Sequence, residues 1–142
     1  MSLVADVLVV LDGSTFFLSD RAGDAGYNPI EYHDGTVWPH DTAIIAEGFR
    51  RYGFREAAGR LAWALFEAAE AFEYRLPEVF AGFDREATTV AVEYPPASRP
   101  QAWASAARLL ALRTLLRLDA EAGARRAVPP LPRPPAPLEP RR

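Results

Sequence analysis

The sequence predicts an all-α fold, and three observations predict it. Apolar residues recur at helical spacing in three segments, at about 39–52, 55–73 and 101–118. Long stretches rich in Gly, Asp, Asn and Pro lie between or beside these segments, as is typical of irregular loops. The composition, 49% hydrophobic and 25% charged over 142 residues, is that of one modest globular domain or of a piece of a larger one.

The first two helices are predicted to form an antiparallel hairpin. Pro39 suits a first helical turn because its φ is fixed, and Asp41 places negative charge near the positive end of the helix. This helix is expected to end at about Tyr52, because Gly53 is a natural residue after a helix C-terminus. The second helix is expected over 55–73, with an apolar face of Ala58, Leu61, Ala62, Leu65, Ala68, Ala69 and Phe72.

The third helix is predicted to begin after Pro100 and to reach Leu118, with apolar residues on two faces. One face carries Trp103, Ala106, Ala107, Leu110, Thr114 and Leu115. The other face carries Leu109, Leu112 and Leu116. A helix that is apolar all round is expected to be buried on both sides, and this chain supplies few partners for it.

The rest of the chain is expected to be irregular. Residues 19–36 and 74–99 form two long loops, and within the second loop Thr88–Glu93 alternates like a short strand. Residues 3–11 fit a short buried strand or a helix fragment equally well. The tail from Val128 is so rich in proline that it is expected to be polyproline-II or disordered.

Charge and composition exclude several classes of function. A net charge of −3 provides no large positive field, so binding to nucleic acid or to an anionic membrane surface is not expected. The chain has no cysteine and therefore forms no disulfide and holds no metal through thiolates. Its apolar opening is interrupted by Asp6 and Asp12 and is too short to span a bilayer, so a cytoplasmic location is expected.

Residues 27–41 contain the densest group of chemically capable side chains. They combine three aromatic residues, two histidines and three carboxylates in a loop that runs into a helix. Either this loop simply caps the helix, with Trp38 as a core anchor, or it binds a ligand. His33 and His40 are seven residues apart in no known metal-binding pattern, so no metal site is predicted.

Two further segments contain candidate site residues. Glu78 follows a proline between apolar neighbours, so it either caps a helix or pairs with Arg75, or it acts as a carboxylate that deprotonates water. Gln101 and Trp103 lie at a helix start and offer an amide and a flat apolar face, which are the two things that a sugar ring requires. For Trp103, burial in the core is an equally good interpretation.

Three motifs in order give the chain a family resemblance. They are YNPIEYHDGTVWPHDTAIIAEGFRRYGF, then RLPEVFAGFDR, then VEYPPASRPQAWASAARLLALRTLL, within about residues 27–118. Together they resemble the C-terminal part of bacterial amylo-α-1,6-glucosidase-like glycoside hydrolases, the glycogen-debranching type. The resemblance implies an (α/α)6 toroid, of which this chain holds the last helices.

The resemblance also implies a mechanism and a set of site residues. Such enzymes resemble inverting glycosidases, in which one carboxylic acid protonates the leaving oxygen and a carboxylate base activates water. By motif position Glu78 looks like the base, whereas the general acid belongs to an upstream segment, so the isolated chain is expected to be inactive. The implied substrate is an α-glucan or oligosaccharide, with no cofactor and no metal. The implied substrate-binding residues are Tyr32, His33, Trp38, Gln101 and Trp103.

The sequence departs from the family in places, and alternatives therefore stay open. Residues 1–26 match poorly, residues 27–120 carry the resemblance, and residues 121–142 form the Pro/Arg-rich tail. One alternative is a non-catalytic carbohydrate-binding or assembly module, or a truncated remnant without the general acid. Another uses Asp34 or Asp41 as an internal acid across from Glu78. Exposed apolar helix faces predict self-association or pairing with the missing toroid segment.

Overall fold

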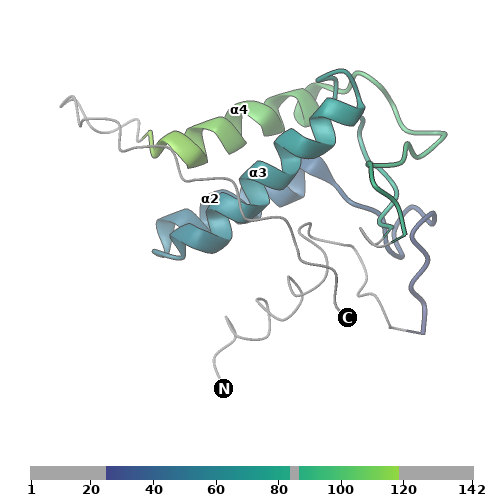
Figure 1. The fold of residues 1–142 in the computed structure, drawn as a ribbon, viewed down its shortest axis with the longest axis horizontal. Coiled ribbons are helices and arrows are strands. Elements are labelled where there is room, and N and C mark those ends of the chain that lie inside the picture. Colours follow the sequence, from purple (N-terminus) through teal and green to yellow (C-terminus); the bar gives the residue numbers. More distant parts are fainter. Residues whose placement is uncertain (1–24, 84–86, 119–142) are drawn as a thin grey trace.

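The computed structural model describes residues 25–83 and 87–118, and these residues form three α-helices. They are α2 (Pro39–Arg51), α3 (Arg55–Ala71) and α4 (Ala102–Leu116), shown in Figure 1. Within these two ranges the backbone forms no strand, which confirms the all-α prediction. The predictions for residues 3–11, for most of segment 1–26 and for the Pro-rich tail concern residues outside the described ranges.

The boundaries of α2 follow from its terminal residues, as predicted. Pro39 occupies the first turn together with Asp41, while Arg50 and Arg51 lie in the last turn, where positive charge suits the helix dipole. After the helix, Gly53 adopts a φ of 91°, a left-handed conformation that glycine adopts at little cost. The chain then reverses into α3.

The predicted apolar stripe of α3 is confirmed. All seven of its residues are buried: Ala58, Leu61, Ala62, Leu65, Ala68, Ala69 and Phe72. α2 and α3 run antiparallel, and α4 packs against both of them (Figure 1). Because so many of the contacting residues are alanines, the helix backbones can approach closely.

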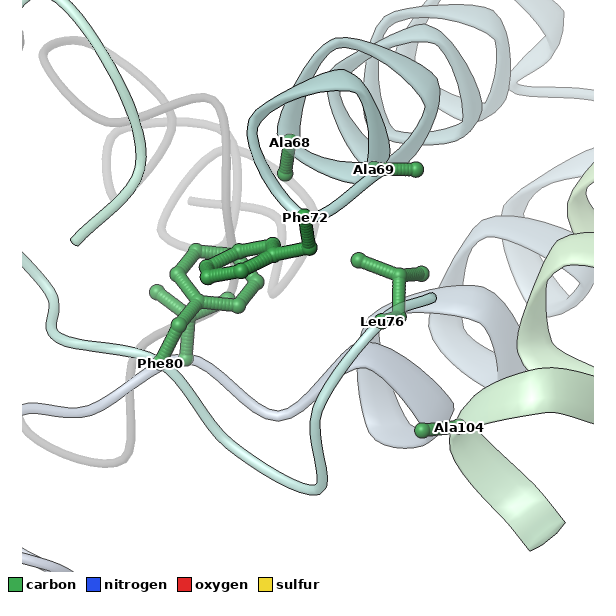
Figure 2. Close-up of a cluster of buried hydrophobic side chains, with 7 residues drawn as sticks. Ala68, Ala69, Phe72, Leu76, Phe80 and Ala104 are labelled. Atoms are coloured by element: carbon green, nitrogen blue, oxygen red, sulfur yellow. The ribbon is translucent and has the colours of Figure 1, made fainter. Parts of the chain in front are cut away.

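The core consists of two hydrophobic clusters along the bundle. The first lies where α3 ends and joins the bundle to the loops; Figure 2 shows most of its members, which are Val37, Ala68, Ala69, Phe72, Leu76, Phe80 and Ala104. The second lies between the three helices and contains Ala43, Ala62, Leu65, Ala107, Ala111 and Leu115. The first cluster therefore fixes the loops that carry the candidate site.

The predicted burial of α4 on both sides is wrong. Its buried residues are Ala104, Ala107, Ala111, Thr114 and Leu115. Trp103 and Ala106, which the periodicity placed on one apolar face, are exposed. Leu109 and Leu112 of the second face are 71% and 43% exposed. Alanines face the other helices, together with Leu115, because small side chains permit the closest packing, while Leu109 and Leu112 are left outside.

The loop between α3 and α4 is irregular, and the predicted strand at 88–93 is also wrong. Among the described residues the pairing there is limited to single antiparallel bridges, one between Val37 and Phe80 and one between Phe80 and Glu93. The backbone bends at 89–90, so no continuous ladder forms there. In the first bridge the Val37 N–H donates to the Phe80 carbonyl at 2.8 Å, and the Phe80 N–H donates back at 3.0 Å. These bridges hold three loop segments at one end of the bundle.

In the part of the chain that the structure covers, no helix combines the length and the apolarity needed to cross a bilayer.

Candidate functional site

The candidate site lies at the end of the bundle where α3 finishes and where α2 and α4 begin (Figure 1). Loops from three parts of the chain meet there, at about 27–38, 74–81 and 92–101. The first loop closes tightly: the Asn28 N–H donates to the Asp34 carbonyl at 2.7 Å. Gly35 is required for this closure, since a Cβ at that position would lie 2.8 Å from the Asn28 carbonyl oxygen.

Glu78 is held by contacts on both its backbone and its side chain. The Tyr32 hydroxyl donates to Glu78 Oε1 at 2.6 Å. The Glu78 N–H donates to the Ser98 carbonyl at 3.0 Å, and buried Pro77 and Val79 flank the residue. Among the residues that the structure describes, Oε2 has no hydrogen-bond partner. Glu78 therefore presents one restrained and one available carboxylate oxygen in a half-buried setting.

Tyr32 remains a hydrogen-bond donor over a wide pH range. The hydrogen bond to Glu78, then burial, then the negative charge of Glu78 raise the pKa of the Tyr32 phenol to about 12. The backbone carbonyl of Tyr32 also accepts a hydrogen bond from Thr36 Oγ1 at 2.6 Å. At neutral pH the phenol is thus protonated and bonded to the carboxylate.

Aromatic rings gather around this pair. We call them the aromatic cluster: Tyr32, His33, Trp38, His40, Tyr94 and Trp103. The Tyr32 ring centroid lies 4.7 Å from those of His33 and Trp38 in edge-to-face arrangements. It lies 5.8 Å from the ring of Tyr94, which the third loop contributes. The His33 ring is parallel to that of Trp38, with centroids 5.8 Å apart.

His40 connects the cluster to α4. Its ring meets Trp38 edge-on with centroids 5.7 Å apart, and it stacks on Trp103 at 4.2 Å with an interplanar angle of 7°. The side chain of Trp103 is 52% exposed, so it does not belong to the core. This exposure favours the interpretation of Trp103 as an accessible flat surface.

The structure therefore brings together five of the six predicted site residues. Glu78, Tyr32, His33, Trp38 and Trp103 are connected through ring contacts and one hydrogen bond. Gln101 lies before α4, where its carbonyl accepts a hydrogen bond from Ser105 Oγ at 2.9 Å. Its Oε1 is buried without a hydrogen-bond partner in the described ranges.

Sequence reasoning missed two members of the aromatic cluster, His40 and Tyr94. His40 lies in the first motif of the family resemblance, two residues after Trp38, and Tyr94 lies in the third motif. No periodicity indicates which way a ring points in an irregular loop. The only available signal was the density of aromatic residues around the motifs.

The two aspartates considered as an internal acid lie at the margin of this arrangement. Asp41 Oδ1 is 3.4 Å from His40 Nε2, and Asp34 is exposed in the first loop. In the described part of the chain, neither side chain makes a hydrogen bond or ion pair with Glu78. Over the same residues, no group of three or more His, Asp or Glu side chains could hold a metal ion.

A cleft of about 650 Å³ lies beside the candidate site but does not contain it. Its lining consists of Val37, Glu67, Ala68, Glu70, Ala71, 80–83 and 88–91. Neither Glu78 nor any member of the aromatic cluster is among these residues. The aromatic cluster thus lies outside this cleft.

This arrangement has the elements of a site for a polar ring such as a sugar. It provides flat aromatic surfaces, a restrained carboxylate and a phenol that stays protonated. In comparisons with known proteins, no family model and no curated protein matches this sequence.

Proposed function

We propose that this chain is the C-terminal segment of an amylo-α-1,6-glucosidase-like glycoside hydrolase, and that Glu78 is its general base. The observation that carries the proposal is the hydrogen bond of 2.6 Å between Tyr32 and Glu78 beneath the aromatic cluster. It joins two of the three motifs on which the family resemblance depends. The proposal places the enzyme in the cytoplasm, with an α-glucan or oligosaccharide as substrate.

In the proposed reaction Glu78 takes a proton from the attacking water. The water oxygen forms a bond to the anomeric carbon while the glycosidic bond breaks, and a general acid donates a proton to the leaving oxygen. The configuration of the sugar inverts because water attacks from the opposite face. Since Tyr32 occupies Oε1, the proton of the water goes to Oε2.

The aromatic cluster would bind the sugar rings. Trp38 and Trp103 offer flat faces for stacking, and Tyr94 and His33 extend this surface around Tyr32. The position of Gln101 at the start of α4 fits a hydrogen-bonding role at the edge of the site.

The general acid is proposed to come from an upstream segment of an (α/α)6 toroid. The exposed leucines of α4 support this, because Leu109 and Leu112 would pack against further helices of such a toroid. In this view the isolated chain carries the base but hydrolyses glycosidic bonds poorly. Asp41→Asn tests the alternative of an internal acid.

The second candidate is a non-catalytic carbohydrate-binding module. It is favoured by the half-exposed Trp103 and by the position of the aromatic cluster outside the neighbouring cleft. Such a module requires the stacking surfaces but does not require the carboxylate of Glu78. The two candidates therefore differ in their response to Glu78→Gln.

The experiment is to measure glucose release from malto-oligosaccharides and from a branched glucan, alongside binding of the same oligosaccharides. If an upstream segment supplies the general acid, the proposal expects turnover that Glu78→Gln abolishes while binding is retained. Turnover that Asp41→Asn also abolishes would identify that acid within the chain. Binding without turnover of these glucans is also expected of a hydrolase segment without its acid, so α-glucosyl fluoride, which needs no acid, then separates the candidates. Fluoride release that Glu78→Gln abolishes supports the hydrolase, and binding with no fluoride release favours the binding module. Absence of both binding and turnover would contradict both candidates.

A further inference from the structure

His40 occupies a position between two tryptophans that come from different parts of the chain. Its ring is parallel to the indole of Trp103, with centroids 4.2 Å apart and an interplanar angle of 7°. Its edge contact with Trp38 has a centroid distance of 5.7 Å and an interplanar angle of 85°. His40 thus connects the first turn of α2 to the first turn of α4.

The two stacked rings differ greatly in exposure. The His40 side chain is 15% exposed, whereas Trp103 is 52% exposed. Because the imidazole covers one face of the indole, the exposed area of Trp103 belongs largely to its opposite face and its edges. The pair is therefore a buried ring that supports an accessible one.

The orientation of His40 is set by packing and by one polar contact. Pro39 beside it is buried in the first turn of α2, and Nε2 lies 3.4 Å from Asp41 Oδ1. Its Nδ1 is buried and has no hydrogen-bond partner within residues 25–83 and 87–118. A buried nitrogen without a partner costs free energy, so the site retains His40 at some expense to stability.

We propose that His40 is a positioning residue that holds the indole of Trp103 as a platform for a glucosyl ring. This inference rests on the proposed carbohydrate-binding function but not on hydrolysis. A flat side chain that is fixed before the ligand arrives loses less conformational freedom on binding. His40 acts through Trp103 and need not touch the sugar.

The geometry of the pair can be tested without any ligand by proton NMR of the histidine rings. The chain has only two histidines, so His33→Gln assigns both sets of ring protons. The ring protons of His40 are expected upfield of their usual position because they lie over the indole face. Trp103→Leu should remove that shift, while the shift of His33, which stacks on Trp38, should remain. A His40 spectrum that is insensitive to Trp103→Leu would overturn the proposal.

The functional step is tested by titrating a malto-oligosaccharide into the full chain and four variants. His40→Ala is expected to weaken binding about tenfold, and Trp103→Leu at least as much. His40→Phe keeps a flat ring behind the indole, so it is expected to bind within about twofold of the original chain. Tyr52→Ser, which changes an exposed side chain after the C-terminal end of α2, is expected to bind normally.

The outcomes separate this inference from the proposed hydrolytic function. Normal binding by His40→Ala, or equal loss in His40→Ala and His40→Phe when both variants melt cooperatively, would overturn the positioning role. Failure of the original chain to bind any oligosaccharide would overturn it as well. Binding that follows the expected order, together with no release of fluoride from α-glucosyl fluoride, would contradict only the proposed hydrolysis.

Discussion

At the scale of single residues, the pair of Tyr32 and Glu78 is the feature from which the chemistry of the site follows. A neutral phenol at 2.6 Å from a carboxylate oxygen stabilises the charged carboxylate and in turn keeps its own proton. The consequence is a carboxylate that is restrained on one oxygen and available on the other. That asymmetry suits a group that must accept a proton from water at a defined position.

This pairing predicts the titration of Tyr32. Its phenol should ionise near pH 12, and Glu78→Gln should bring the transition down toward the ordinary value of 10. Because the folded pKa is raised, the contribution to stability is fully present below pH 10 and is lost as the pH rises toward 12. Ultraviolet absorbance against pH measures the transition, and Tyr32→Phe identifies it by its disappearance. A transition that Glu78→Gln does not move would contradict the hydrogen bond.

Also at the residue scale, the sequence allowed most of the candidate site to be predicted, but not its details. Glu78, Trp38 and Trp103 stand out because proline, glycine and aromatic residues crowd their neighbourhoods. His40 and Tyr94 were missed because irregular loops have no period from which a side-chain direction can be read. Their rings are placed by the tertiary contacts of the loops, which sequence patterns do not encode locally.

At the scale of elements, a buried carboxylate fastens α2 to α4. Glu47 on α2 accepts hydrogen bonds from Arg50 Nε at 2.7 Å and from Arg51 Nε at 3.0 Å. Across the interface it also accepts one from Thr114 Oγ1 of α4, at 3.0 Å. Glu47 is 6% exposed, and Thr114 is 3% exposed. A charge so deeply buried is stable only because it is paired and hydrogen-bonded.

Replacing Glu47 should therefore destabilise the bundle and change its response to acid. The hydrogen bonds from Arg50, opposed in part by burial, lower the pKa of Glu47 to about 2, with help from Arg51 and Thr114. The resulting stability is present above pH 4.5 and is lost as the pH falls toward 2. We expect Glu47→Gln to cost about 2–3 kcal/mol at neutral pH, measured by urea unfolding.

Thr114→Val is the matched control for this interface. It removes a single hydrogen bond at nearly constant volume and should cost about 1 kcal/mol. The acid-dependent loss of stability should persist in Thr114→Val and shrink in Glu47→Gln. Equal stability of the original chain and Glu47→Gln at neutral pH would show that the hydrogen bonds of Glu47 contribute nothing to the stability of the bundle.

The helices themselves were predictable to different degrees. The seven positions that the period of α3 predicted are all buried, and it missed the small residues Ala57, Gly59 and Ala64 beside them. α4 is apolar on every side, and a pattern without contrast cannot tell which residues face the core. Ala104, Ala107 and Ala111 are among the residues that face the other helices, because small side chains allow α4 to approach its neighbours.

At the scale of the whole molecule, the all-α class followed from periodicity, whereas a toroid cannot be derived from three helices. What the structure adds is a pair of exposed leucines on α4. Leu109 and Leu112 are exposed there, and Trp103 lies on the same helix at the candidate site. Apolar surface of this kind is typical of an interface with another chain or domain.

This surface predicts self-association of the isolated chain. Sedimentation velocity should show a weight-average mass that rises with concentration, because association buries the leucines of α4. The double variant Leu109→Gln and Leu112→Gln should remain monomeric over the same range without losing helix content. As a matched control, Leu65→Ala changes a buried leucine and should lower stability by about 2–5 kcal/mol without changing the apolar surface. Association that the double variant retains would place the interface elsewhere.

The central claim is that Glu78 is the base of an inverting site that acts on α-glucosides. α-Glucosyl fluoride tests it most directly, because fluoride leaves without protonation and the reaction therefore needs no general acid. We predict that the chain releases fluoride together with β-glucose, the inverted anomer, and that Glu78→Gln abolishes this release. Release of α-glucose, release that survives Glu78→Gln, or no release above the uncatalysed rate would contradict the claim.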